Sequence, residues 1–511
     1  MAGCIAKING CDVKDIYARQ LLEQNLIEHE AMKRRDEINP AMFGAVGDGE
    51  TDDSVALQAC IDYAHQYNLN INCLGKSYLV SHENYRIVNE RDYGGLFITS
   101  GIAIRDGKFK IATASNDFTS VFTVLTDQPV LFRNIYIDGN GLDGNQAHHT
   151  DLEDGGISGI KSPAGYNANV VMQFCEIHNC YTDGVQFNGA YLRLENCEIT
   201  KAGRNGVTAN SEITEVLHCK LDGNGVRCDP RSQFHVEPDN DDYIKFIRLY
   251  DSTFTGSVND TTSAVKFHLA KQIPVDHFIV ENCVADRIVF ALRPNANSTI
   301  SNFVCVDTTA KVRFGVYEGN EFKSAYISGL IGNVTATDAY HRVKKLEIRN
   351  SKLSSLTACA EHYLIEGCDF SKDEPAATLA VATTGMYINN CVPETVTIRD
   401  SDFTNTSYGV RIQKYNTTEV DGVAVDQPAK KITISDCTFG SIQAVAAFAD
   451  HLQVDGCILN ASGVCIAAGE KTKAAFVSNN TISLKETSYI SGSATVLATN
   501  NLFPVTQTTE G

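Results

Sequence analysis

The phrase ENCEIT (residues 195–200) recurs in five related forms between Val170 and Pro294. Each form alternates polar, small and apolar residues over about the length of a strand, and Gly, Asn or Asp residues follow it. A second short apolar strand comes next, as in GVTANS (residues 206–211). The five forms are FCEIHN (174–179), ENCEIT (195–200), LHCKLD (217–222), YDSTFT (250–255) and ENCVAD (281–286).

The spacing of this phrase indicates a solenoid. Its small residue is Cys175, Cys197, Cys219, Ser252 and Cys283 in turn, so the steps are 22, 22, 33 and 31 residues. Repeats of twenty-odd residues with strand periodicity are typical of stacked β coils. We therefore predict an all-β fold, a right-handed parallel β-helix (solenoid), with a short N-terminal helix and a capping helix at its start.

The alternation within each second strand predicts which side chains face the core. With a period of two, Val185 and Phe187 point inward, as do Val207 and Ala209, and the residues between them point outward. Because equivalent residues of successive coils stack at about 4.8 Å, the outward residues form columns. One column is Asn188, Asn210, Glu237, His268 and Arg293, and the other is Gln186, Thr208, His235, Lys266 and Ala291.

Composition limits the class of protein and its partners. The chain has 511 residues with 43% hydrophobic and 21% charged residues, which is typical of a globular protein. A net charge of −19 argues against a nucleic-acid partner, although it leaves room for a local basic groove that binds an acidic glycan. No stretch approaches 18 apolar residues, so we expect no membrane insertion. The N-terminus shows no signal-peptide pattern, so we expect synthesis in a cytoplasm and export by another route.

Neither the cysteines nor the histidine-rich segment predicts a metal site. Most of the 17 cysteines fall in the repeated phrase, where free thiols stacked in the core explain them. No CxxC pair occurs, so zinc is not expected. The polar segment GNGLDGNQAHHTDLEDGGISG (residues 139–159) has no fixed ligand spacing and favours a solvated loop. We predict no metal and no cofactor.

The N-terminal part differs from the repeats. Residues 12–37 predict a helix that begins at an N-cap Asp12, but their heptad pattern is poor. Its packing partner is either another chain or the first coil. We divide the chain into an N-terminal attachment or assembly segment (1–38), a β-helix catalytic domain (39–505) and a tail (506–511). The last coils are either further rungs or a C-terminal cap.

A distinctive segment follows Pro40. FGAVGDGETDD (residues 43–53) is a Gly/Asp turn that leads into ALQACID (residues 56–62), an amphipathic helix. We expect Thr51-Asp52-Asp53 to start this helix, and Val55, Leu57, Ile61, Tyr63 and Ala64 to form its apolar side. The helix would cover the open strand edges of the first coil. Capping explains the Asp pair better than catalysis does.

These residues resemble a known family. FGAVGDGETDD followed by ALQACID resembles the opening motif of the pectate-lyase-like superfamily of right-handed β-helix proteins, which includes phage tailspikes, glycan depolymerases and epimerases. FHVEP (residues 234–238) is similar to the Ile-Asp-Ile-Glu-Pro strand of phage-type members, with His235 where Asp is usual and Glu237 matching. The resemblance implies a polysaccharide ligand, a homotrimer, and attachment to other virion tail proteins through the N-terminus.

The columns contain the residues that glycan cleavage needs. Hydrolysis requires two carboxylates, about 5–5.5 Å apart for retention and about 6.5–9.5 Å for inversion. Glu237 supplies one, and Asp239, Asp241, Asp242 or Asp183 is the candidate for the other. β-Elimination from a uronate instead requires a cation near the carboxylate and a base. Lys266, His268, Arg293 and His235 could fill those roles.

Our candidate catalytic residues are Glu237, His235, Lys266, His268, Arg293 and Asp239, and our candidate substrate-binding residues are Asn188, Asn210, Gln186, Asp183 and Arg204. Two alternatives are an exposed charge ladder without function and a site elsewhere, such as a cleft between subunits.

Three functions remain open. The first is a phage tailspike-type depolymerase in the virion tail that binds and cleaves a bacterial capsular or surface polysaccharide. The second is a bacterial polyuronate lyase or epimerase, and the third is a non-catalytic glycan-binding spike.

Overall fold

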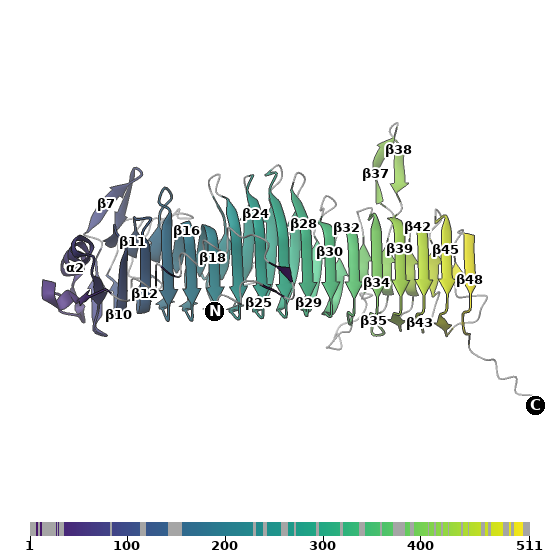
Figure 1. Ribbon diagram of the computed structural model, residues 1–511, viewed down its shortest axis with the longest axis horizontal. Helices are drawn as coiled ribbons and strands as arrows, with labels where there is room; N and C mark the ends of the chain where they lie inside the picture. The colour runs from purple at the N-terminus through teal and green to yellow at the C-terminus, as the bar shows by residue number, and fades with distance from the viewer. Residues whose placement is uncertain are drawn as a thin grey trace, which may run out of the picture. The chain divides into compact units, whose positions relative to one another are not determined.

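A computed structural model describes most of the chain as coils of short parallel strands (Figure 1). The described residues are Lys7–Ile8, Cys11–Asp12, Ile27, His29, 35–81, 84–112, 119–141, 156–227, 231–238, 243–256, 264–269, 272–292, 296–316, 320–336, 343–357, 360–370, 384–388, 393–406, 408–412, 415–420, 423–427, 429–440, 443–447, 449–460, 465–468, 472–483, 490–491 and 495–503.

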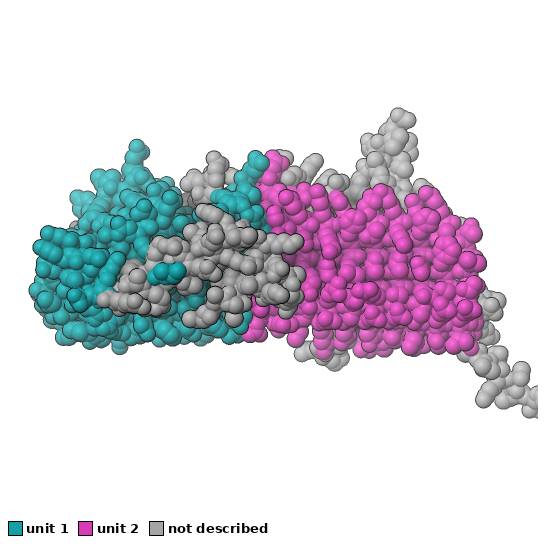
Figure 2. Space-filling model, viewed as in Figure 1, with its two compact units in different colours: residues 1–279, 283–286 teal, residues 280–282, 287–511 magenta. Residues whose placement is uncertain are grey.

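The chain forms two compact units (Figure 2). The first comprises residues 1–279 and 283–286, and the second comprises residues 280–282 and 287–511. Strands β24 (Pro274–Glu281) and β25 (Val284–Leu292) contain residues of both units.

The coils of the first unit pair in parallel, strand on strand, as the repeat predicts. Val185 pairs with Val207, Val207 with Phe234 and Phe234 with Val265, and these side chains are buried. Phe187 and Ala209 are buried in the same way, so the predicted inward side of each strand is confirmed. The elements of this unit are β1 (Lys7–Ile8), β2 (Cys11–Asp12), β3 (Glu37–Ile38), η1 (Pro40–Phe43), β4 (Asp48–Asp52), α2 (Ser54–Tyr67), β5 (Asn70–Asn72), β6 (Ser77–Val80), β7 (Tyr85–Val88), β8 (Arg91–Gly94), β9 (Leu96–Ile98), β10 (Ile102–Ile111), β11 (Ser120–Val124), β12 (Pro129–Asp138), β13 (Ser158–Ser162), β14 (Ala168–Gln173), β15 (Glu176–His178), β16 (Val185–Glu195), β17 (Glu198–Thr200), β18 (Val207–Leu217), β19 (Lys220–Asp222), β20 (Phe234–Val236), β21 (Ile244–Tyr250), β22 (Thr253–Thr255) and β23 (Val265–Leu269).

The repeated phrase forms one corner of the coil. Its second residue has a left-handed backbone in coil after coil, with φ of 54° at Asn196, 55° at His218 and 46° at Asp251. Asn and Asp tolerate this conformation better than other residues with a side chain, which explains their recurrence. The next residue is small, free of disulfides and buried, as at Cys197 and Cys219, so the predicted core ladder of thiols is confirmed for these described residues.

The second unit continues the same pattern. Its strands also pair in parallel, for example β28 with β30 and β42 with β45. An insert is the exception, because β37 and β38 form an antiparallel hairpin. The strands are β26 (Thr299–Val306), β27 (Thr309–Val316), β28 (Glu321–Ser328), β29 (Ile331–Ala336), β30 (Val343–Arg349), β31 (Lys352–Thr357), β32 (Ala360–Glu366), β33 (Thr384–Ile388), β34 (Thr395–Arg399), β35 (Asp402–Phe403), β36 (Tyr408–Ile412), β37 (Tyr415–Val420), β38 (Val423–Gln427), β39 (Ala429–Ser435), β40 (Thr438–Phe439), β41 (Gln443–Ala447), β42 (Ala449–Asp455), β43 (Ile458–Leu459), β44 (Ile466–Ala468), β45 (Ala474–Ser478), β46 (Thr481–Ile482), β47 (Ile490–Ser491) and β48 (Thr495–Thr499).

The helix expected after the Gly/Asp turn is present as α2, but two details of the prediction are wrong. Val55 is 81% exposed and Tyr63 is 41% exposed, whereas Leu57, Ile61 and Ala64 are buried as predicted. Asp53 does not cap the helix through its side chain. Its carboxylate instead accepts the backbone N–H groups of Val46 and Gly47 at 2.7 and 3.0 Å, which fixes the preceding turn.

The helix predicted over residues 12–37 lies mostly outside the described residues. At its two ends the prediction is wrong, because Asp12 lies in β2 and Glu37 lies in β3. β3 pairs with β5, so the parallel coils already begin at Glu37. Ile27 and His29 are helical, and the ring of His29 lies against the Val130 carbonyl at 3.3 Å. No helix within the described ranges has the length and apolarity needed to cross a membrane.

Candidate functional site

The polar columns lie on the outward side of β16, β18, β20 and β23. Gln186 pairs with Thr208, Thr208 with His235, and His235 with Lys266, so the register of the first predicted column is confirmed through Lys266. In the second column, Asn188 pairs with Asn210, and the Glu237 backbone N–H donates to Asn210 Oδ1 at 2.9 Å. Arg293 and Asp239 lie outside the described residues, as do Asp241 and Asp242.

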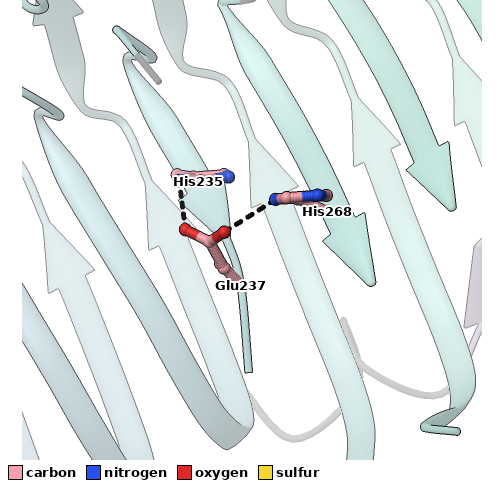
Figure 3. A group of neighbouring side chains, drawn as sticks. All are labelled: His235, Glu237 and His268. Carbon is pink, nitrogen blue, oxygen red and sulfur yellow. Dashed lines mark hydrogen bonds and ion pairs between the residues drawn. The ribbon is translucent and has the colours of Figure 1, made fainter. Parts of the chain in front are cut away.

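Glu237 is the centre of a compact ionic group (Figure 3). His268 Nδ1 lies 2.7 Å from Glu237 Oε1, which is hydrogen-bonding distance. The Arg204 guanidinium donates to Glu237 Oε2 at 3.4 Å, and His235 Nδ1 lies 3.7 Å from the same oxygen. Both carboxylate oxygens therefore have partners, and the carboxylate is held in one orientation.

The environment keeps Glu237 ionised. Burial alone would raise its pKa, but the hydrogen bond with His268 and the Arg204 guanidinium hold the pKa well below its usual value. A general acid must carry a proton at working pH, and this carboxyl does not. Glu237 is instead suited to hold the His268 ring, with Nδ1–H toward the carboxylate and the other ring nitrogen, Nε2, on the far side.

His235 differs from the prediction that its column is exposed, because its side chain is fully buried. The Asn205 amide explains its protonation. Asn205 Oδ1 accepts the Ser232 N–H at 2.9 Å, so Nδ2 faces Thr208 Oγ1 at 3.0 Å and His235 Nδ1 at 3.3 Å. His235 Nδ1 is then an acceptor, and the proton of the neutral ring sits on Nε2, which is buried without a hydrogen-bond partner. Burial lowers the pKa of His235 well below its usual value, against the opposing effect of Glu237.

Asp183 and Arg204 form the buried support of this group. Asp183 has no exposed surface, and it accepts hydrogen bonds from Thr208 Oγ1 at 2.7 Å and the Asn205 N–H at 3.0 Å. Arg204 lies 3.6 Å from Asp183 Oδ2 and thus bridges the two carboxylates. Burial raises the pKa of Asp183, although Arg204 and the two hydrogen bonds oppose this. The prediction that Asp183 binds substrate directly is wrong, because its side chain has no exposed surface.

The remaining candidates divide by exposure. Gln186, Asn188, Lys266 and His268 are half-buried on the outward side, where a ligand can reach them. Thr208 and Asn210 are buried instead, at 3% and 6% exposure, so the prediction that all outward residues are exposed is wrong. For Thr208 the reason is the turn before each strand, because its hydroxyl group is hydrogen-bonded to Asp183 and Asn205.

Sequence reasoning missed Asn205, although a signal for it exists. Asp183-Gly184-Val185 and Asn205-Gly206-Val207 are the same phrase one coil apart. Polar residues at equivalent turn positions in neighbouring coils can hydrogen-bond, as the Asn205 N–H does with Asp183. Aligning the turns as well as the strands would have found it.

A metal ion is one possible ligand of the group. His235, Glu237 and His268 each offer one ligand atom, and these atoms lie within 4.8 Å of one another. Two contacts oppose a cation there. Arg204 already forms an ion pair with Glu237, and the Asn205 Nδ2–H group directed at His235 Nδ1 leaves the proton on Nε2. This donor set fits a metal poorly.

Comparison with known proteins supports the architecture. Residues 328–503 match the family model described as "Right handed beta helix region". The chain is 26% identical over 196 residues to the capsule K30/K69-specific depolymerase of Klebsiella phage K64-1. That match covers 36% of this chain and 24% of the depolymerase, so the chain matches about a quarter of the relative's length.

Solved structures of low sequence identity are also similar. The A-module of mannuronan C-5 epimerase AlgE6 of Azotobacter vinelandii is 14% identical, with a TM-score of 0.37, and the alignment covers 91% of this chain and 99% of the module. Pre-mature gene product 12 of bacteriophage phi29 is 13% identical, with a TM-score of 0.37, over 95% of this chain and 75% of that chain. The Dettilon tailspike protein is 11% identical, with a TM-score of 0.32, over 74% and 69% respectively. The stacked parallel coils of both units and the match of residues 328–503 to that family model support one fold, the right-handed parallel β-helix.

Proposed function

We propose that the chain binds and cleaves a bacterial surface polysaccharide as part of a phage tailspike-type depolymerase. The observation that carries this proposal is the pair of His268 and Glu237, 2.7 Å apart on the outward side of adjacent coils. A histidine held by a carboxylate is a common form of general base. The partial similarity to a phage capsule depolymerase supports a polysaccharide as the substrate.

The protonation of the group favours β-elimination over hydrolysis. Hydrolysis needs a protonated acid beside a second carboxylate. Of the candidate carboxylates that the structure describes, Glu237 stays ionised and Asp183 is fully buried. Elimination needs a base for the proton next to the carboxylate of a uronate. His268 Nε2 takes that proton, the C–H electron pair forms a C=C bond, and the glycosidic C–O bond breaks. The departing oxygen then takes a proton from solvent.

Lys266 completes the chemistry on the same strand. It precedes His268 by two residues on β23, so both side chains leave the same face. Its ammonium group can lie against the uronate carboxylate and stabilise the negative charge that develops when the proton leaves. Arg204 supports the reaction indirectly. Its ion pair with Glu237 fixes the orientation of the carboxylate that holds His268.

Assembly and attachment form the other part of the proposal. The resemblance to phage tailspikes supports a homotrimer in the virion tail, attached to other tail proteins through the N-terminal segment and acting outside the host cell. Sedimentation at micromolar concentration tests the assembly, and a monomer there would contradict it.

Incubation with purified capsular polysaccharides from many bacterial serotypes tests the function. We expect new reducing ends together with the ultraviolet absorbance of unsaturated uronates. His268→Gln and Glu237→Gln should each lower the rate by about 10²–10⁴. His218→Asn is the matched control, because His218 pairs with Asp251 at 2.8 Å in the same unit and away from the columns.

Each result separates the alternatives. Reducing ends without absorbance would mean hydrolysis, and binding without reducing ends would mean a non-catalytic spike. If the Glu237→Gln variant cleaves at the wild-type rate, the catalytic site does not lie at this column.

A further inference from the structure

A pocket of about 380 Å³ lies in the first unit, beside the proposed catalytic pair. Its walls come from the turn before β14, from β16 and β18, and from Tyr243 just before β21. The volume falls within the range of small-molecule sites, about 300–1,000 Å³. The residues that matter here are Tyr166, Asn167, Asn188, Asn210, Glu212 and Tyr243.

The pocket and the catalytic pair share Asn210. Asn210 lines the pocket, and its Oδ1 accepts the backbone N–H of Glu237 at 2.9 Å. Its Nδ2 donates to Asn188 Oδ1 at 3.2 Å, and Asn188 Nδ2 donates to the Ser162 carbonyl at 3.1 Å. This chain of amides is fixed at both ends, so the polar wall is organised before a ligand arrives.

The pocket is electrically neutral, unlike the coil that carries Lys266. Its one carboxylate, Glu212, forms an ion pair with Lys245. The other polar lining groups named here are amides and the two tyrosines. Tyr243 is 38% exposed, and its hydroxyl group donates a hydrogen bond to Asp276, which holds the ring in one place as a flat surface.

These features match the chemistry of an uncharged sugar. Sugar C–H faces pack on aromatic rings, and sugar hydroxyls pair with amide groups. Two coil steps of about 4.8 Å separate Asn210 from His268 along the column, so neighbouring units of one glycan chain can reach both. We infer that this pocket is the subsite for a neutral sugar of the polysaccharide whose acidic sugar binds at His268 and Lys266. The inference rests on the proposed function and adds that the substrate contains both kinds of sugar.

Ligand-detected NMR with monosaccharides tests the pocket without requiring cleavage. The probes are glucose, galactose, mannose and N-acetylglucosamine, with glucuronate as the charged comparison, and the protein is the full chain. We expect at least one neutral sugar to bind. Tyr243→Ala should weaken that binding by about fivefold or more, because it removes the ring. Tyr243→Phe keeps the ring and loses only the hydrogen bond to Asp276, so it should weaken binding less than Tyr243→Ala does. Glucuronate binding should not change with Tyr243→Ala.

Two controls keep this result separate from the proposed function. His268→Gln should slow cleavage of a polysaccharide by about 10²–10⁴ and retain neutral-sugar binding, whereas His218→Asn should change neither. The inference is overturned if no neutral sugar binds or if Tyr243→Ala binds as the wild type does, even when cleavage depends on His268. A third outcome is that a neutral sugar binds through Tyr243 but no polysaccharide is cleaved. This outcome would support the sugar-binding pocket and contradict the proposed catalysis.

Discussion

The Ser252 hydroxyl accepts the backbone N–H of Cys219 at 2.9 Å and donates to the Tyr250 carbonyl at 2.8 Å. The same relationship repeats with other residue types. Cys219 Sγ accepts the Cys197 N–H at 3.4 Å, and Asn480 Oδ1 accepts the Cys457 N–H at 2.8 Å in the second unit. In these three cases the side chain at this position of the repeated phrase satisfies a buried backbone donor one coil earlier.

Ser252→Ala should destabilise the protein. The change leaves the buried N–H of Cys219 without a partner, which typically costs about 1–3 kcal/mol. Ser252→Cys should cost less, because a thiol already fills the equivalent role at Cys219. Urea unfolding of the two variants and the wild type measures the difference, and equal stability of the Ala and Cys variants would contradict the role of the acceptor.

Phe174→Asn should stabilise the protein by about 1 kcal/mol. Phe174 occupies the left-handed position of the phrase with φ of 54°, and its side chain is 51% exposed, so little packing is lost. Asn196 shows which residue type suits this position one coil later. Thermal unfolding measures the gain, with Asn196→Phe as the reciprocal variant. A lower melting temperature for Phe174→Asn would show that packing of the ring outweighs the backbone strain.

Acid should destabilise the protein through His235. Burial lowers the pKa of His235 in the folded protein. Below about pH 6.5 this histidine is therefore protonated in the unfolded chain and still neutral in the folded chain. Stability is unaffected above that pH and falls by about 1.4 kcal/mol per unit below it, until the folded pKa is reached. His235→Gln should remove this component. Unfolding at pH 7.5 and pH 5 measures it, and an equal loss in both proteins would assign the acid sensitivity to other groups.

Asp183→Asn should lower the free energy of unfolding of the protein by about 3 kcal/mol. Asn keeps the shape but removes the buried negative charge that Arg204 faces, and Arg204 is itself only 8% exposed. The control is Asp251→Asn, which alters the exposed pair with His218 and should change stability by less than about 1 kcal/mol. Calorimetry of both variants gives the comparison. Similar melting temperatures would show that Arg204 is satisfied without Asp183.

The sequence allowed the coils to be predicted because each coil repeats the same local rules. The small residue at 175, 197 and 219 sets the register, and the register sets the columns, so His235 and Lys266 could be placed side by side. Exposure could not be predicted in this way. Asp183 and Asn205 lie in turns, and the packing of turns over Thr208 depends on the whole coil and not on strand alternation.

The pocket also escaped prediction for a physical reason. Tyr166, Glu212 and Tyr243 come from three different coils and share no phrase, so nothing in a linear pattern joins them. Only the amides at 188 and 210 repeat, and these were found.

The left-handed corner has a consequence for engineering. Two neighbouring corner residues, such as Asn196 and His218, have the same backbone conformation and the same place in their coils. A segment that runs from one to the next is thus a complete module whose two ends match. Excising or duplicating residues 196–217 would join two equivalent corner positions, and the number of coils could then be changed one module at a time.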